Sequence, residues 1–116
     1  MLDMETTIFM KGNPFSDRNK LCYAGVSDGQ AITLYDIEYS QKPYGEILNQ
    51  LRNKILEHDL IIAFNAKFDI HWSRRYGIHY TGNIWCLQLA EFIITGQEQR
   101  MPSLDSVGLR CQLGTK

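Results

Sequence analysis

Residues 60–69 have the sequence Leu-Ile-Ile-Ala-Phe-Asn-Ala-Lys-Phe-Asp, and this segment is the main indication of the fold class. The apolar run from Leu60 to Phe64 is too short for the core of a helix, so it predicts a buried strand. A short helix is expected from Phe68 to Tyr76, and Gly77 is a typical residue for its end. A buried strand that leads into a helix is typical of a sheet with helices packed on it, which is an α/β protein.

The segments before this stretch predict a β-meander and a helix. Strands are expected at residues 1–10, 21–27 and 31–37, and Asp28-Gly29 predicts a tight hairpin turn between the last two. A helix from Tyr44 to His58 is predicted by apolar residues at spacings of one, three and four, namely Ile47, Leu48, Leu51 and Ile55.

After Gly77 the chain is expected to form a strand at residues 83–85, a helix that stops at Gly96, and a last helix that Ser103 caps and that ends near Arg110. The order is therefore three strands, then helix, strand, helix, strand, helix and helix. This order predicts one mixed sheet covered by helices, in a single domain over residues 1–116. It matches a ribonuclease H-like arrangement, although several other α/β folds would share it.

Composition and charge exclude several classes of protein. The hydrophobic share of 44% and the charged share of 22% are those of an ordinary globular protein. The sequence shows neither a long apolar run for a membrane span nor a secretory signal, so a cytoplasmic location is expected. The three widely spaced cysteines suit reduced thiols better than a metal site. A net charge of −1 argues against a protein that grips long duplexes by electrostatics alone, but not against an enzyme for strand ends.

Two acidic residues stand close together in the first predicted strand. Asp3 and Glu5 are two residues apart in Leu-Asp-Met-Glu-Thr-Thr, so their side chains are expected on the same face of the strand. Neighbouring carboxylates repel each other unless water or a cation lies between them. Carboxylate oxygens are the ligands that Mg²⁺ and Mn²⁺ prefer. The alternative is an exposed strand whose two acids are simply hydrated.

A second polar motif follows the buried strand at residues 60–64. Asn65 ends the strand, and Asp69 is expected in the first turn of the next helix. Ligands of open α/β sheets usually bind in the crevice just beyond the carboxyl ends of the strands, where these residues lie. The alternative is purely structural, with Asp69 facing the positive end of the helix dipole and Asn65 capping a turn.

The two motifs together resemble a known family. Leu-Asp-Met-Glu-Thr-Thr and Asn-Ala-Lys-Phe-Asp are similar to the first two motifs of the proofreading 3′–5′ exonuclease domain of family A DNA polymerases. That domain belongs to the DEDD nuclease superfamily, and the bacteriophage type is the most similar. The segment from Trp85 to Gly114 is similar to the helices that follow the second motif. The resemblance thus covers nearly the whole chain.

The resemblance implies a site with two divalent metal ions, Mg²⁺ or Mn²⁺, on either side of the scissile phosphate. It implies that Asp3, Glu5 and Asp69 are the metal-binding and catalytic residues, with Asp69 acting mostly through water. Thr6 and Asn65 would contact the terminal nucleotide of a single-stranded DNA 3′ end, and Phe68 would support the site by packing. Ile8 and Phe9 would lie under the last base, although an aromatic residue beside a sheet is usually part of the core. A polymerase domain, in the same chain or a separate one, is the implied partner, in a bacterial or phage-infected cell.

The family's third motif, a Tyr or His followed four residues later by an Asp, does not occur in this sequence. The 116 residues are therefore expected to be a truncated domain whose own activity is in doubt. Two alternatives stay open: a non-catalytic fragment of nuclease fold that binds nucleic acid or a protein, and a relative that trims RNA. Six cations near the motifs would face a phosphate backbone or form an ordinary hydrated surface, namely Lys11, Arg18, Lys20, Lys67, Arg74 and Arg75.

Overall fold

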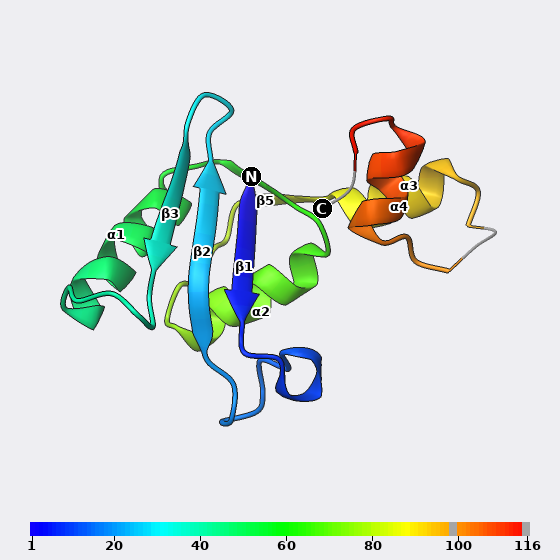
Figure 1. The fold of residues 1–116 in the computed structure, drawn as a ribbon. Coiled ribbons are helices and arrows are strands. Elements are labelled where there is room, and N and C mark those ends of the chain that lie inside the picture. The colour runs from blue at the N-terminus through cyan, green and yellow to red at the C-terminus, as the bar shows by residue number, and fades with distance from the viewer. Residues whose placement is uncertain (98–99, 115–116) are drawn as a thin grey trace.

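The computed structural model describes residues 1–97 and 100–114. In these ranges the chain is a small α/β protein (Figure 1). Its elements, in chain order, are β1 (Leu2–Thr6), the short 3₁₀ helix η1 (Phe9–Lys11), β2 (Leu21–Ser27), β3 (Ile32–Asp36), α1 (Tyr44–Leu56), β4 (Leu60–Ala63), α2 (Ala66–Arg75), β5 (Asn83–Cys86), α3 (Leu87–Ile94) and α4 (Leu104–Arg110).

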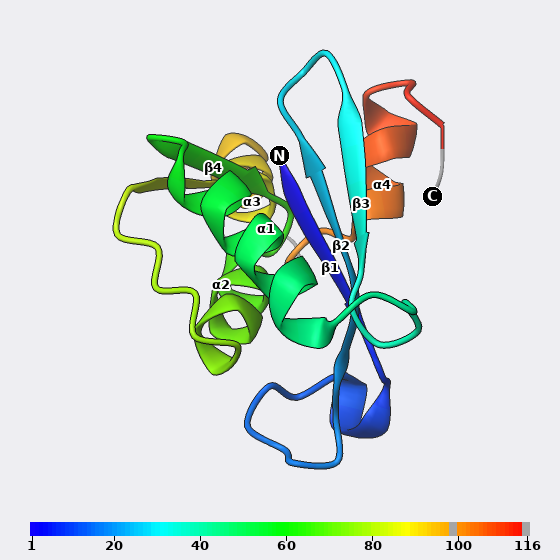
Figure 2. The ribbon, with the colours of Figure 1, turned by 90° about the vertical axis from the view of Figure 1, so that its left-hand side faces the viewer.

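The predicted meander is present as an antiparallel sheet in the order β1-β2-β3. Helices α1 and α2 pack on the same face of this sheet (Figures 1 and 2). Leu2 and Met4 point to the helix side and are almost completely buried. Asp3 and Glu5 alternate with them and are exposed, as the two-residue period of a strand requires.

The prediction of a single mixed sheet is wrong for the described residues, because the strands form two sheets. β4 and β5 pair in parallel with each other, and no ladder joins them to β1 within the described ranges, although β1 and β4 are neighbours. Met1 exchanges backbone hydrogen bonds with Ser27 of β2. In an antiparallel ladder, only every second residue directs its backbone N–H and C=O toward the partner strand. Since Met1 does so, the backbone N–H and C=O of Leu2 and Met4 point away from β2, toward the outer edge of β1. There the Met4 N–H donates to the carboxylate of Asp69 instead of a strand.

The predicted helices and strands occur, with shifted ends. β1 stops at Thr6, well before Met10. Its register with β2 shifts between Glu5 and Thr6, and the chain then leads into η1, with left-handed backbone at Met10 and Lys11. α2 begins at Ala66, two residues before the predicted start, because Asn65 is left-handed (φ 58°) and turns the chain directly into the helix. The predicted cap at Ser103 is confirmed, since its hydroxyl oxygen accepts from the Ser106 N–H at 3.1 Å.

The main core lies between the three-stranded sheet and the helices α1 and α2. Trp72 of α2 and Leu51 of α1 are fully buried there. α3 and α4 lie beyond β1 (Figure 1), and the bidentate ion pair between Glu91 and Arg110 joins them. None of the helices in the described part of the chain has both the length and the apolarity needed to cross a bilayer.

Candidate functional site

A pocket of about 470 Å³ lies where β1 ends and α2 begins. It collects residues from both sequence motifs and from three further elements. Among the residues that line it are all those predicted for the site from sequence: Asp3, Glu5, Thr6, Asn65, Phe68 and Asp69. Their side chains come together because β1 and β4 are neighbours and α2 starts directly after β4.

Asp69 is the most constrained acidic residue of this pocket. Its side chain is 2% exposed, and its Oδ1 accepts a hydrogen bond from the backbone N–H of Met4 at 2.9 Å. Met4 stands between Asp3 and Glu5 in β1, so this bond places the Asp69 carboxylate against the segment that carries the other two acids. Asp69 therefore also has a structural role, because it ties α2 to the free edge of β1.

The environment of Asp69 disfavours its ionised form. Burial raises the pKa of the Asp69 carboxyl group to about 7, and the negative charges of Asp3 and Glu5 add to this rise. The hydrogen bond from Met4 opposes it. The pocket thus has an excess of negative charge that a bound cation would offset.

The carboxylates fit a hard divalent cation in donor type and charge, but not as three direct ligands. Within residues 1–97 and 100–114, no group of three or more His, Cys, Asp or Glu side chains is arranged so that it could hold a metal ion. Asp3 and Glu5 are exposed on β1, whereas Asp69 is buried and one of its carboxylate oxygens accepts the Met4 N–H. This arrangement suits Asp69 as a group that acts on a cation through water.

Several lining residues were not predicted from sequence as site residues: Gly12, Phe64, Gln88 and Leu104. Lys11, one of the six cations named from sequence, also lines the pocket. Gln88 could have been predicted, since it follows β5 as Asn65 follows β4, and parallel strands end at the same edge of a sheet. Leu104 belongs to α4, and no local signal relates it to the other motifs. The exposed side chain of Ile8 also lines the pocket, whereas the ring of Phe9 is covered by the guanidinium of Arg18 at 3.8 Å.

Gly12 fixes the turn that follows η1. Its φ is +72°, a left-handed value that favours glycine, and a Cβ added there would lie 2.6 Å from Oγ1 of Thr6. Its carbonyl oxygen accepts the indole N–H of Trp72 at 2.9 Å. The turn is therefore packed directly against two predicted site residues, Thr6 and Phe68.

Replacing Gly12 with Ala should lower the free energy of unfolding by about 1–3 kcal/mol, because strained backbone and a steric contact add up. Urea denaturation of the variant measures this loss. Gly29→Ala is a matched control, since Gly29 also has a positive φ of 93° but its Cβ would meet nothing within 4 Å. Equal losses in the two variants would show that the contact with Thr6 has no energetic weight.

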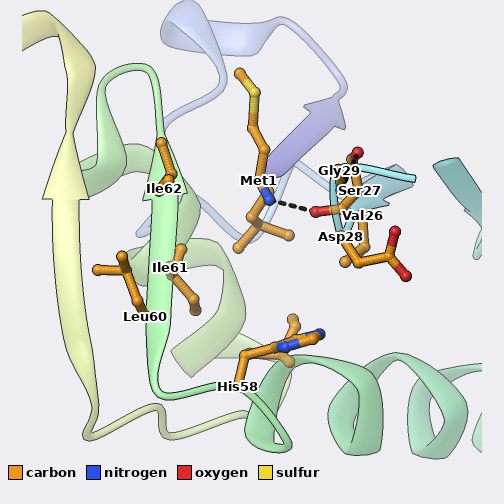
Figure 3. Close-up of a pocket in the computed structure, with 11 residues that line it drawn as sticks. Met1, Val26, Ser27, Asp28, Gly29, His58, Leu60, Ile61 and Ile62 are labelled. Atoms are coloured by element: carbon orange, nitrogen blue, oxygen red, sulfur yellow. Dashed lines mark hydrogen bonds between the residues drawn. The ribbon is translucent and has the colours of Figure 1, made fainter. Parts of the chain in front are cut away.

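A second cavity of about 460 Å³ separates the far end of β1 from β4. Figure 3 shows Met1 and Ser27 on one side of it, joined by a hydrogen bond, and Leu60, Ile61 and Ile62 of β4 on the other. His58 lies at its base. None of the predicted site residues lines this cavity.

An α/β fold with acidic side chains gathered beside the end of a strand is consistent with a nuclease. The sequence model of the 3′–5′ exonuclease domain of family A DNA polymerases matches residues 1–110, so the chain belongs to this family. Family membership supports a 3′–5′ exonuclease role and a connection with proofreading by DNA polymerases. A search of curated proteins gives no match to the chain.

Proposed function

We propose that this chain takes part in the hydrolysis of the 3′-terminal phosphodiester of DNA, with divalent metal ions bound at Asp3, Glu5 and Asp69. The hydrogen bond from the Met4 N–H to Asp69 carries this proposal, since it brings the two acidic motifs, far apart in sequence, to one place. The match to the exonuclease family supplies the reaction class.

The roles of the acids follow from their exposure. Asp3 and Glu5 would hold the ions directly, because both side chains project from the exposed face of β1. Asp69 would act through water, because its carboxylate is buried and bonded to Met4. When bound, Mg²⁺ or Mn²⁺ supplies an acidified water and neutralises charge on the scissile phosphate and the leaving 3′ oxygen.

The neighbouring residues would position the terminal nucleotide. Thr6 and Asn65 offer a hydroxyl and an amide at the pocket, and Phe68 packs beside them against Trp72, with ring centroids 6.4 Å apart. The substrate in this proposal is a single-stranded DNA 3′ end delivered by a polymerase domain, in the same chain or a separate one, in the cytoplasm of a bacterial or phage-infected cell. A ribonuclease H-like arrangement is the fold that we propose, since β1 and β4 are neighbours.

A second candidate function is a non-catalytic module that binds strand ends or a protein. The observation that favours it is that no three acidic, His or Cys side chains of the described ranges could hold a metal ion together. Under this alternative Asp69 has only its structural role.

Single-turnover cleavage of an oligonucleotide labelled at its 5′ end separates the two candidates. Our proposal predicts loss of single nucleotides from the 3′ end, stopped by EDTA and reduced at least about 100-fold in Glu5→Ala. Glu46→Ala is the matched control, since Glu46 is exposed on α1, away from the pocket. Cleavage that persists in EDTA or in Glu5→Ala would contradict the proposal. Deoxy and ribo 3′ ends compared in the same assay give the preferred sugar.

A further inference from the structure

The six cations near the motifs have different surroundings in the structure. Lys20 is paired with Glu38 at 2.8 Å. Arg75 donates to the carbonyl oxygen of Pro14 at 3.0 Å, and Arg18 covers the ring of Phe9. Lys67 and Arg74 line a different groove, between α2 and α3. Lys11 is the member of this set that lines the carboxylate pocket.

The backbone around Lys11 is held in an uncommon conformation. Met10, Lys11 and Gly12 have consecutive positive φ values of 46°, 58° and 72°. Left-handed backbone at residues other than glycine costs free energy, and such residues gather at functional sites.

Contacts from three directions fix this turn relative to the acids. Trp72 of α2 donates to the Gly12 carbonyl, and Thr6 at the end of β1 fills the space beside the Gly12 Cα. Asn19 closes the base of the loop, since its side-chain amide donates to the carbonyls of Phe9 at 2.7 Å and Asn13 at 3.1 Å. The backbone next to Lys11 is therefore held against β1 and α2, the two elements that carry the acidic motifs.

We infer that Lys11 is a substrate-binding residue whose ammonium group contacts a phosphate of the DNA 3′ end in the carboxylate pocket. A lysine that lines the same pocket as the acids repels a metal ion, but it attracts the anionic phosphate that the substrate brings. Lysine acts on phosphate as a point charge, so the contact requires placement near the strand and not a particular angle. The inference rests on the proposed function, because it takes DNA as the ligand of the pocket.

The test is the binding of a short 5′-fluorescein-labelled oligothymidylate to the full chain, measured by anisotropy with Ca²⁺ in place of Mg²⁺. Lys11→Ala should weaken binding roughly 10-fold or more, since a hydrogen bond to a charged group is lost. It should also reduce the slope of log K against log salt by about 0.7, the share of one phosphate contact on a single strand. Lys11→Arg should stay within about threefold of the parent, because the charge is kept. Lys42→Ala, an exposed lysine in the loop before α1, is the control and should leave binding unchanged.

The outcomes separate this inference from the proposed function. If Lys11→Ala and Lys42→Ala bind DNA equally well and Lys11→Ala binds Mn²⁺ more tightly, Lys11 only balances the charge of the acids. This result would overturn the inference about Lys11 but not the proposed function. A parent chain that binds no oligothymidylate would overturn the proposed function and this inference with it. Both Ala variants keep a Cβ, so the left-handed backbone at Lys11 is unchanged, and circular dichroism should show parent-like folding.

Discussion

Asp69→Asn is expected to raise the free energy of unfolding of the metal-free chain at pH 8 by up to about 4 kcal/mol relative to the parent chain. The pKa of the Asp69 carboxyl group is raised from 3.8 to about 7, and each pKa unit corresponds to about 1.4 kcal/mol. Asn keeps an oxygen that accepts the Met4 N–H but removes the buried charge beside Asp3 and Glu5. The same change should weaken Mn²⁺ binding, so stability and ion binding move in opposite directions.

The stability gain should depend on pH in a defined window. Between about pH 4 and pH 7 the folded chain holds a proton on Asp69 that the unfolded chain has lost, so this group makes the parent chain less stable as the pH rises. Below pH 4 both states are protonated and the difference vanishes. Above pH 7 Asp69 is ionised in both states, and its destabilising effect on the parent chain is complete and no longer changes with pH.

Urea denaturation of the parent chain and Asp69→Asn in EDTA, at several pH values from 4 to 8, measures this effect. Asp17→Asn, in an exposed loop, is the control and should show no such trend. If the difference in free energy of unfolding between the parent chain and Asp69→Asn does not change with pH, Asp69 is ionised in the folded chain at no cost. That result would contradict a raised pKa of Asp69 in the pocket.

Trp72→Ala should lower the free energy of unfolding by about 3–5 kcal/mol, which is enough to unfold many small domains. Trp72 is fully buried, packs near Phe68 and Tyr76, and donates its indole N–H to Gly12. The variant loses a large buried surface and also the bond that anchors the turn carrying Lys11. Thermal unfolding followed by circular dichroism measures the loss.

Trp85→Ala is the matched control, because Trp85 is 55% exposed. It should cost less than about 1 kcal/mol. Trp72→Phe separates packing from hydrogen bonding, since it keeps an aromatic ring but leaves the Gly12 carbonyl without its donor; we expect a loss of about 1–3 kcal/mol. Similar losses in Trp72→Ala and Trp85→Ala would contradict the placement of Trp72 in the core.

Local patterns in the sequence predicted most of the helices and strands. The two-residue period of β1, the hairpin at Asp28-Gly29 and the cap at Ser103 each depend on neighbouring residues alone. Whether the strands join into one sheet depends on contacts distant in sequence, and the prediction of a single mixed sheet was wrong. The Asp69 carboxylate takes the Met4 N–H at the free edge of β1, which no local pattern in the sequence indicates.

In the site, too, local sequence patterns predicted some features, and contacts between distant residues determine the others. Asp3 and Glu5 share a face because of strand geometry, and Asp69 falls in the first turn of α2 as its motif indicates. The place of Lys11 and Gly12 in the pocket depends on an unusual left-handed turn held by Trp72, a residue sixty positions later in the chain. The sequence showed the turn-forming residues but not the direction in which the turn would face.

A calorimetric titration of Mn²⁺ into the parent chain, Asp3→Ala and the control Asp17→Ala tests whether the acidic pocket binds a divalent cation. If acids from β1 and α2 share a cation, the parent and the control should bind Mn²⁺ with the same affinity, and Asp3→Ala should lose most of it, by roughly 10-fold or more per lost ligand. Identical weak binding by all three proteins would contradict the account.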